Sequence, residues 1–122
     1  RLPPAQIDGP PTGDVLIVGW GGTYGALRQA AHQLRAEGQA VGHLHLRYLN
    51  PLQSNVGALL ARYRRVVVAE LNLGQLRSIL RDKFLVDARG LNKIQGKPFK
   101  VREVVEAVRK LLPVPASREL HA

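Results

Sequence analysis

The sequence predicts a three-layer α/β fold, in which a mostly parallel sheet lies between two layers of helices. Four segments have the composition of β-strands, at 14–18, 40–47, 65–70 and 84–88. They begin about 20 to 25 residues apart, which is enough chain for a crossover helix between neighbouring parallel strands. The first and third segments contain continuous aliphatic runs, as expected of central strands that are buried on both faces.

Helical periodicity between and after these segments predicts four helices. Their predicted spans are 23–36, 54–63, 74–83 and 101–112. The first helix presents Tyr24, Leu27 and Leu34 on one face, which we expect to be buried. The second presents Leu60 and Tyr63 in the same way. Each helix can therefore cover the sheet with one apolar stripe.

The chain divides into three parts by composition. Residues 1–13 hold four prolines and are predicted to form a linker, with a short edge strand around Ile7. Residues 14–112 are predicted to form a single α/β domain. Residues 113–122 are predicted to be a frayed tail.

Composition narrows the class of protein. The chain is 45% hydrophobic and 22% charged, as in ordinary soluble domains, and no apolar run approaches the length of a membrane span. There is no cysteine, which excludes disulfides, thiolate metal sites and cysteine nucleophiles within this chain. We expect a cytoplasmic protein. Because the sequence starts at Arg1 and contains no methionine, we also expect a piece cut from a longer polypeptide.

The net charge of +9 raises the question of nucleic acid as a partner. The longest basic cluster is only the segment 62–65, and no predicted helix carries a continuous basic face. The pattern favours a solvated or subunit-facing basic surface over a nucleic-acid site.

The glycine-rich segment 19–25 follows the first predicted strand and raises two interpretations. Such a corner can bring backbone N–H groups close to a phosphate, or it can simply allow a tight turn and close packing of helix on strand. The dinucleotide fingerprint requires a sixth-position glycine, where this chain has Tyr24, and the P-loop Gly-Lys-Ser/Thr is absent. We favour the turn. The candidates for the alternative, a site for a phosphorylated cofactor such as coenzyme A, are Gly21, Gly22, Thr23, Arg47 and Lys93.

His43 and His45 alternate with apolar residues on the second predicted strand, so that one face of this strand is polar. This face is expected to meet solvent, another domain or a ligand. Two histidines without a third ligand placed by sequence are a weak metal signal, and we predict no metal site. Because no serine lies in a nucleophile elbow, we predict no catalytic residue either.

Polar residues follow the third and fourth predicted strands. In an open α/β sheet this is where ligands bind, although the same residues can serve only as turns and caps. Both readings stay open, and the functional one includes a subunit interface. The interface candidates are Tyr24, Glu70, Asn72, Gln75, Asn92, Gln95 and Phe99.

Four segments in order, and the spacing that links them, resemble one family: "VGWGGTYGAL", "HLRYLNPL", "AELNLGQL" and "FLVDARGLNKIQGKPF". They are similar to the C-terminal region of the alpha subunit of 2-oxoglutarate (2-oxoacid):ferredoxin oxidoreductases, over about residues 14 to 112. The resemblance implies a domain like the transketolase C-terminal domain, often with one antiparallel strand, for which the segment around Ile7 is our candidate.

What the resemblance implies about function concerns the whole enzyme. Such enzymes decarboxylate a 2-oxoacid oxidatively to its acyl-CoA with thiamine diphosphate, magnesium and coenzyme A, and pass electrons through an iron–sulfur cluster to ferredoxin. The resemblance places those cofactors in other regions. It implies that this chain is a noncatalytic assembly domain, whose partners are the remainder of the alpha subunit and the beta subunit.

Overall fold

The computed structural model describes residues 3–48, 52–71, 75–92 and 97–113, apart from the side chain of Asn92. These residues form a five-stranded sheet in the order β1-β3-β2-β4-β5. The elements in chain order are β1 (Ile7–Asp8), β2 (Gly13–Trp20), the 3-10 turn η1 (Gly21–Thr23), α1 (Tyr24–Ala36), β3 (Val41–Leu46), α2 (Val56–Leu60), β4 (Tyr63–Glu70), α3 (Gln75–Phe84), β5 (Ala88–Asn92) and α4 (Val101–Arg109). None of the helices in the described ranges is long and apolar enough to cross a bilayer.

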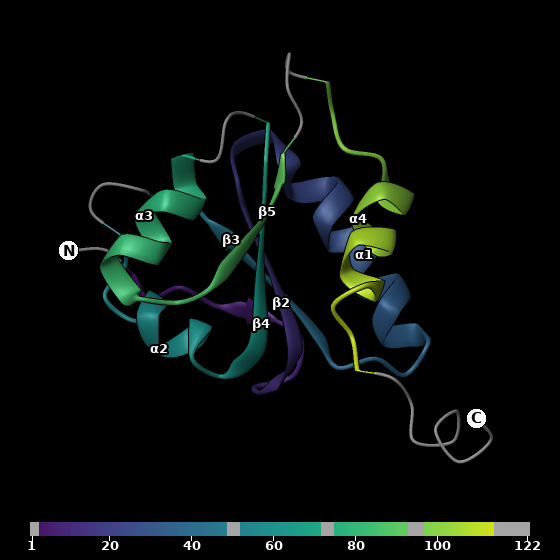
Figure 1. The fold of residues 1–122 in the computed structure, drawn as a ribbon, viewed down its shortest axis with the longest axis horizontal. Helices are drawn as coiled ribbons and strands as arrows, with labels where there is room; N and C mark the ends of the chain where they lie inside the picture. The colour runs from purple at the N-terminus through teal and green to yellow at the C-terminus, as the bar shows by residue number, and fades with distance from the viewer. Residues whose placement is uncertain (1–2, 49–51, 72–74, 93–96, 114–122) are drawn as a thin grey trace.

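Strands β2 to β5 are parallel, whereas β1 pairs with β3 in the antiparallel direction. This confirms the predicted α/β class and the extra antiparallel strand around Ile7. Helices α1 and α4 cover one face of the sheet, and α2 and α3 cover the other (Figure 1). The sheet is therefore the middle of three layers.

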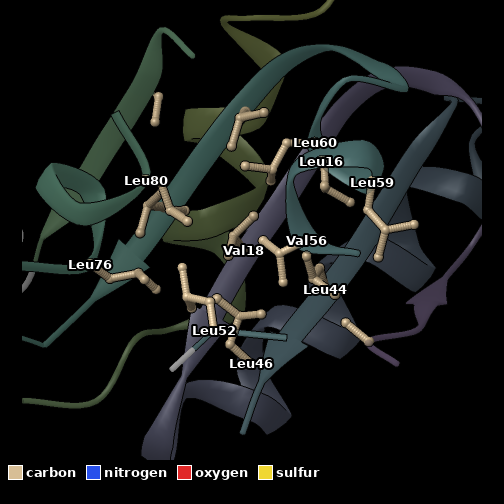
Figure 2. Packing of buried hydrophobic residues seen from close by; sticks show 14 of the residues in the cluster. Leu16, Val18, Leu44, Leu46, Leu52, Val56, Leu59, Leu60, Leu76 and Leu80 are labelled. Carbon is tan, nitrogen blue, oxygen red and sulfur yellow. The ribbon is translucent and has the colours of Figure 1, made fainter. Parts of the chain in front are cut away.

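The central strand β2 supplies both cores. Leu16 and Val18 face α2 and α3, while Val15 and Ile17 face α1 and α4, and all four are fully buried. This alternation is what a strand with helices on both faces requires. The core on the α2 and α3 side is drawn in Figure 2, where leucines from the sheet lie against those of the two helices.

The core on the other side depends on α1 and α4. The buried face of α1 carries Leu27, Ala30, Ala31 and Leu34, as its periodicity predicts. Tyr24 was expected on the same face, and that expectation is wrong because Tyr24 is 49% exposed. It stands in the first turn of α1, where the helix reaches the edge of the core.

The fourth strand lies later in the chain than predicted. The segment 84–88 was expected to be this strand, but Phe84 ends α3 and β5 begins at Ala88. Leu85 adopts a left-handed φ of 55° and its N–H donates to the Arg81 carbonyl at 2.9 Å, which ends the helix. Phe84 packs against the core as the last residue of the helix. Residues 88–92 form the strand because their main chain pairs with that of β4.

The second helix is shorter than predicted because Tyr63 belongs to the next strand. Tyr63 opens β4 and pairs with Gly13 of β2, where a side chain larger than hydrogen would collide with its ring. Its hydroxyl donates to the Pro10 carbonyl. Tyr63 remains buried, as expected, but from the sheet and not from α2.

The proline-rich N-terminal segment lies against the domain. Asn55 accepts from the backbone N–H of Ala5 and donates to the carbonyl of the same residue, both at 2.8 Å. The side-chain amide of Gln53 donates to the Pro3 carbonyl at 2.9 Å. These bonds join the segment before β1 to the loop before α2, some 50 residues away in sequence.

Gly19 sets how closely α1 approaches β2. A Cβ atom at this position would meet the side chain of Leu27 and would lie 2.7 Å from Thr23 Oγ1. Both neighbours are buried, so neither can move into solvent. At Gly25, in the first turn of α1, an added Cβ would meet nothing within 4 Å.

We predict that Gly19→Ala destabilises the domain by about 1 to 3 kcal/mol, because overpacking a closed core costs this much. The matched control is Gly25→Ala, which should stabilise it by roughly 0.5 to 1 kcal/mol through helix propensity. Urea unfolding of both variants measures the difference. Equal effects of the two substitutions would contradict the packing role of Gly19.

Candidate functional site

The carboxyl ends of the four parallel strands lie together at one edge of the sheet. The final residues of β2 and β3, Trp20 and Leu46, are register partners, and so are Glu70 of β4 and Asn92 of β5. Helix α1 connects β2 to β3 on one face of the sheet, and helix α2 connects β3 to β4 on the other face. This edge is therefore the position where open α/β sheets carry their sites.

The glycine corner at the end of β2 forms the turn η1. Gly21 has a φ of +67°, which favours glycine, and Thr23 is buried with its hydroxyl donating to the Trp20 carbonyl at 3.1 Å. A Cβ at Gly21 or Gly22 would meet no atom within 4 Å. The Thr23 hydroxyl is thus used to close the turn itself.

Glu70 is a fully buried carboxylate at the end of β4. Its Oε1 accepts from the backbone N–H of Leu76 at 2.7 Å, and its Oε2 accepts from that of Arg77 at 3.0 Å. Both N–H groups belong to the first turn of α3 and have no partner inside the helix. Glu70 therefore attaches the start of α3 to the sheet, with its negative charge at the positive end of the helix dipole.

The other interface candidates are distributed along the same edge. Phe99 is 7% exposed and packs in the core with α1 and α4, while Gln75 opens α3 with an exposed side chain. Asn92 ends β5 beside Glu70. Three candidates, Asn72, Lys93 and Gln95, lie outside the described residues, as do Asn50, Pro51, Gly74 and Gly96 of the same motifs.

A groove runs beside β3, on the face of the sheet that α1 covers. It has a volume of about 950 Å³, and we call it the β3 groove. Its lining residues are Pro3, Pro4, Ala5, Gln6, Ile7, Asp8, Tyr24, Arg28, His43, His45, Arg47 and Gln53. The polar face predicted for this strand thus becomes the floor of a hollow. Of the phosphate-site candidates, Arg47 lines the groove, whereas Gly21, Gly22 and Thr23 do not.

The environment of the two groove histidines lowers the pKa of both, which favours their neutral form. Burial lowers the pKa of His43 from 6.5 to about 4, and the neighbouring His45 adds to this lowering. Burial also lowers the pKa of His45, with a further contribution from the charge of Arg47. Tyr24 packs against both rings, with centroid distances of 5.6 Å to His43 and 5.0 Å to His45. Within the described ranges, no three side chains of His, Cys, Asp or Glu form a metal-binding group.

Two groove residues, Arg28 and Gln53, were not found from the sequence. Arg28 follows Tyr24 by four residues on α1, so the two side chains stand on one face of the helix. This spacing was a usable signal once Tyr24 had been singled out. Gln53 had no such signal, because only the folded loop before α2 brings it to the groove.

Basic residues gather at the opposite, amino edge of the sheet. Arg64 and Arg65 of β4, Arg89 of β5 and Lys110 after α4 line a second hollow of about 370 Å³ together with Asp14. Part of the net charge is therefore concentrated far along the strands from the glycine corner.

Comparison with known proteins decides the family. The model described as pyruvate:ferredoxin oxidoreductase core domain II matches residues 13–104, which is most of the chain. The chain belongs to this family. Its similarity to 2-oxoglutarate oxidoreductase subunit KorA of Mycobacterium tuberculosis is 44% identity over 123 residues, covering 92% of this chain and 19% of KorA.

Two solved structures, one of an oxidoreductase and one of a transketolase, are similar in fold. The 2-oxoglutarate:ferredoxin oxidoreductase of Magnetococcus marinus, solved with 2-oxoglutarate, coenzyme A and succinyl-CoA bound, superposes with a TM-score of 0.85 at 28% identity over 92% of this chain and 20% of its own. A split-gene transketolase, described as an inactive beta4 tetramer, superposes with a TM-score of 0.66 at 26% identity over 92% of this chain and 43% of its own.

The resemblance seen in the sequence motifs is thus confirmed. The core domain II chain is a domain of a 2-oxoacid:ferredoxin oxidoreductase alpha subunit with a transketolase-like fold. It spans about a fifth of the length of the curated relatives that it matches.

We predict that Glu70→Gln in this core domain II chain lowers the free energy of unfolding by about 1 to 3 kcal/mol, because the amide can accept only one of the two buried hydrogen bonds. Glu106→Gln, on the exposed face of α4, is the matched control and should change it by less than about 0.5 kcal/mol. Chemical unfolding near neutral pH measures both. A Glu70→Gln domain as stable as the control variant would refute the anchoring role.

We predict that acid destabilises the domain through His43. Because the folded pKa of about 4 lies below the unfolded value of 6.5, protons bind preferentially to the unfolded chain between these values. The contribution of His43 to the free energy of unfolding is fully present above pH 6.5. It is lost as the pH falls toward 4, by on the order of 3 kcal/mol. The charged and titratable neighbours of His43 are His45, Asp8, Arg35 and Arg28.

The measurement is urea unfolding at several pH values across this window. His43→Gln should flatten the fall in unfolding free energy, whereas His32→Gln, at an exposed position on α1, should retain it. A slope that survives in His43→Gln would show that other groups carry the acid sensitivity.

Proposed function

We propose that this chain is a noncatalytic structural and assembly domain of a cytoplasmic, thiamine-diphosphate-dependent 2-oxoglutarate (2-oxoacid):ferredoxin oxidoreductase. That enzyme decarboxylates its 2-oxoacid oxidatively, transfers the acyl group to coenzyme A and passes the electrons to ferredoxin. In this proposal the domain joins the remainder of the alpha subunit to the beta subunit. Thiamine diphosphate, magnesium and the iron–sulfur cluster are held by other regions.

The observation that carries the proposal is the use made of the motif residues at the carboxyl edge. Both carboxylate oxygens of Glu70 accept hydrogen bonds from the backbone of α3, and the Thr23 hydroxyl donates to the backbone of the glycine corner. Phe99 is packed inside the core. Such groups shape a rigid edge instead of presenting reactive atoms to a substrate.

The composition of the chain also supports the placement of the cofactors in other regions of the enzyme. Iron–sulfur clusters are held by cysteine thiolates, and this chain has no cysteine, so cluster ligands come from outside it. The relatives of this domain are about five times its length. Their other regions leave ample chain for the cofactor sites.

The first experiment is reconstitution. The domain is co-expressed with a tagged beta subunit and with an alpha subunit that lacks the corresponding segment, and the tag is purified. We expect the domain to co-purify in stoichiometric amount, and to release no carbon dioxide from 2-oxoglutarate when assayed alone with coenzyme A and an electron acceptor.

The purification is washed at high salt. The net charge of +9 favours nonspecific binding of the domain to acidic proteins, and salt screens that attraction. A domain that stays in the unbound fraction would contradict the assembly role. Turnover by the domain alone would contradict the noncatalytic role.

A further inference from the structure

The floor of the β3 groove holds polar atoms that have no partner. His43 is 2% exposed and Gln53 is 6% exposed, yet His43 Nε2 and Gln53 Oε1 make no hydrogen bond with any described residue. The same is true of His45 Nδ1. Since the Nε2 amide group of Gln53 donates to the Pro3 carbonyl, the carbonyl oxygen of Gln53 is the atom left over.

Three such atoms in one hollow require an explanation, because each buried polar group without a partner costs about 1 to 3 kcal/mol. All three belong to residues that line the β3 groove. Because each of the three atoms is itself covered, a ligand in the groove can supply their partners once it displaces the groups that cover them. Neutral imidazoles suit this purpose, since each offers one N–H donor and one acceptor nitrogen.

The groove has two exposed positive charges in its lining. They are Arg28 on α1 and Arg47 after β3, and neither has a carboxylate partner among the described residues. The one carboxylate of the lining, Asp8, is already paired with Arg35 and His32, both at 3.3 Å. Two guanidinium groups that face one hollow are suited to phosphate oxygens.

Tyr24 adds an aromatic side chain to the groove lining. It is 49% exposed although it contacts both histidine rings, so part of it remains accessible. A planar ring can stack there, while an attached phosphate reaches the arginines. The volume of about 950 Å³ is in the range of small-molecule sites.

We propose that the β3 groove binds a nucleoside phosphate, with its base against Tyr24 and toward the unpartnered atoms of His43, His45 and Gln53, and its phosphate on Arg28 and Arg47. This site shares Tyr24 with the glycine-rich segment 19–25, but its lining does not include Gly21, Gly22 or Thr23. It depends on the side chains of this chain alone, so it stands whether or not the domain has the assembly role proposed above.

The test is titration of the 122-residue chain with ADP, followed by calorimetry and by NMR of the histidine side chains near neutral pH. ADP should bind with a Kd below about 1 mM and shift the signals of His43 and His45 but not that of His32. Adenosine, which lacks phosphate, should bind at least about tenfold more weakly.

Two exposed arginines provide a matched pair of variants. R47Q removes a positive charge from the groove and should raise the Kd for ADP by about tenfold or more, whereas R102Q removes one from α4 and should change it by less than about twofold. Both variants are expected to keep the thermal midpoint of the parent chain, since neither side chain is buried.

Several results would overturn the proposal: no ADP binding at 10 mM, about ten times the highest expected Kd, equal weakening by R47Q and R102Q, or binding that leaves the His43 and His45 signals unmoved. A tetraglutamate peptide is titrated in parallel. If the peptide shifts these signals and ADP does not, the groove receives an acidic protein segment and the nucleotide proposal fails.

Discussion

Burial of β2 on both faces is the constraint on which the other features of this domain depend. Because the strand has parallel neighbours on both sides and helices above and below, every residue from Val15 to Val18 is removed from water. Its side chains alternate between two cores, so a shift of one residue would exchange the contents of both. The crossover helices must then lie on opposite faces, and the strand ends must meet at one edge.

That edge places strong demands on the backbone. Where β2 ends, the chain must enter α1 at once. This is possible because Gly19 lets Thr23 and Leu27 approach the strand and Gly21 adopts a left-handed φ. Where β4 ends, the first turn of α3 would leave N–H groups unpaired inside the protein. Glu70 satisfies two of them. The most distinctive polar residues of the motifs are thus explained by how the layers join.

The β3 groove has a different origin. On the face that α1 covers, Val41 of β3 lies in the core, whereas His43 and His45 lie beyond it. Helix α1 begins at Tyr24, so its first turn is the last part of the helix that covers this strand. His43 and His45 therefore face a hollow that the N-terminal segment encloses from the other side. Hydrogen bonds from Asn55 and Gln53 hold that segment in place. A polar hollow at the edge of the sheet is the result.

The sequence by itself determined the α/β class, the central strands, the helical stripes and the family, because these depend on local periodicity and on short ordered motifs. It placed the last strand too early, since Phe84 is equally apolar in a helix or a strand and only pairing with β4 selects Ala88 to Asn92. It singled out Glu70, yet the partners of that carboxylate lie on the next helix. Tertiary structure alone decided that Arg28, His43, Arg47 and Gln53 share one hollow, because their proximity follows from the packing of α1, β3 and two loops and not from spacing along the chain.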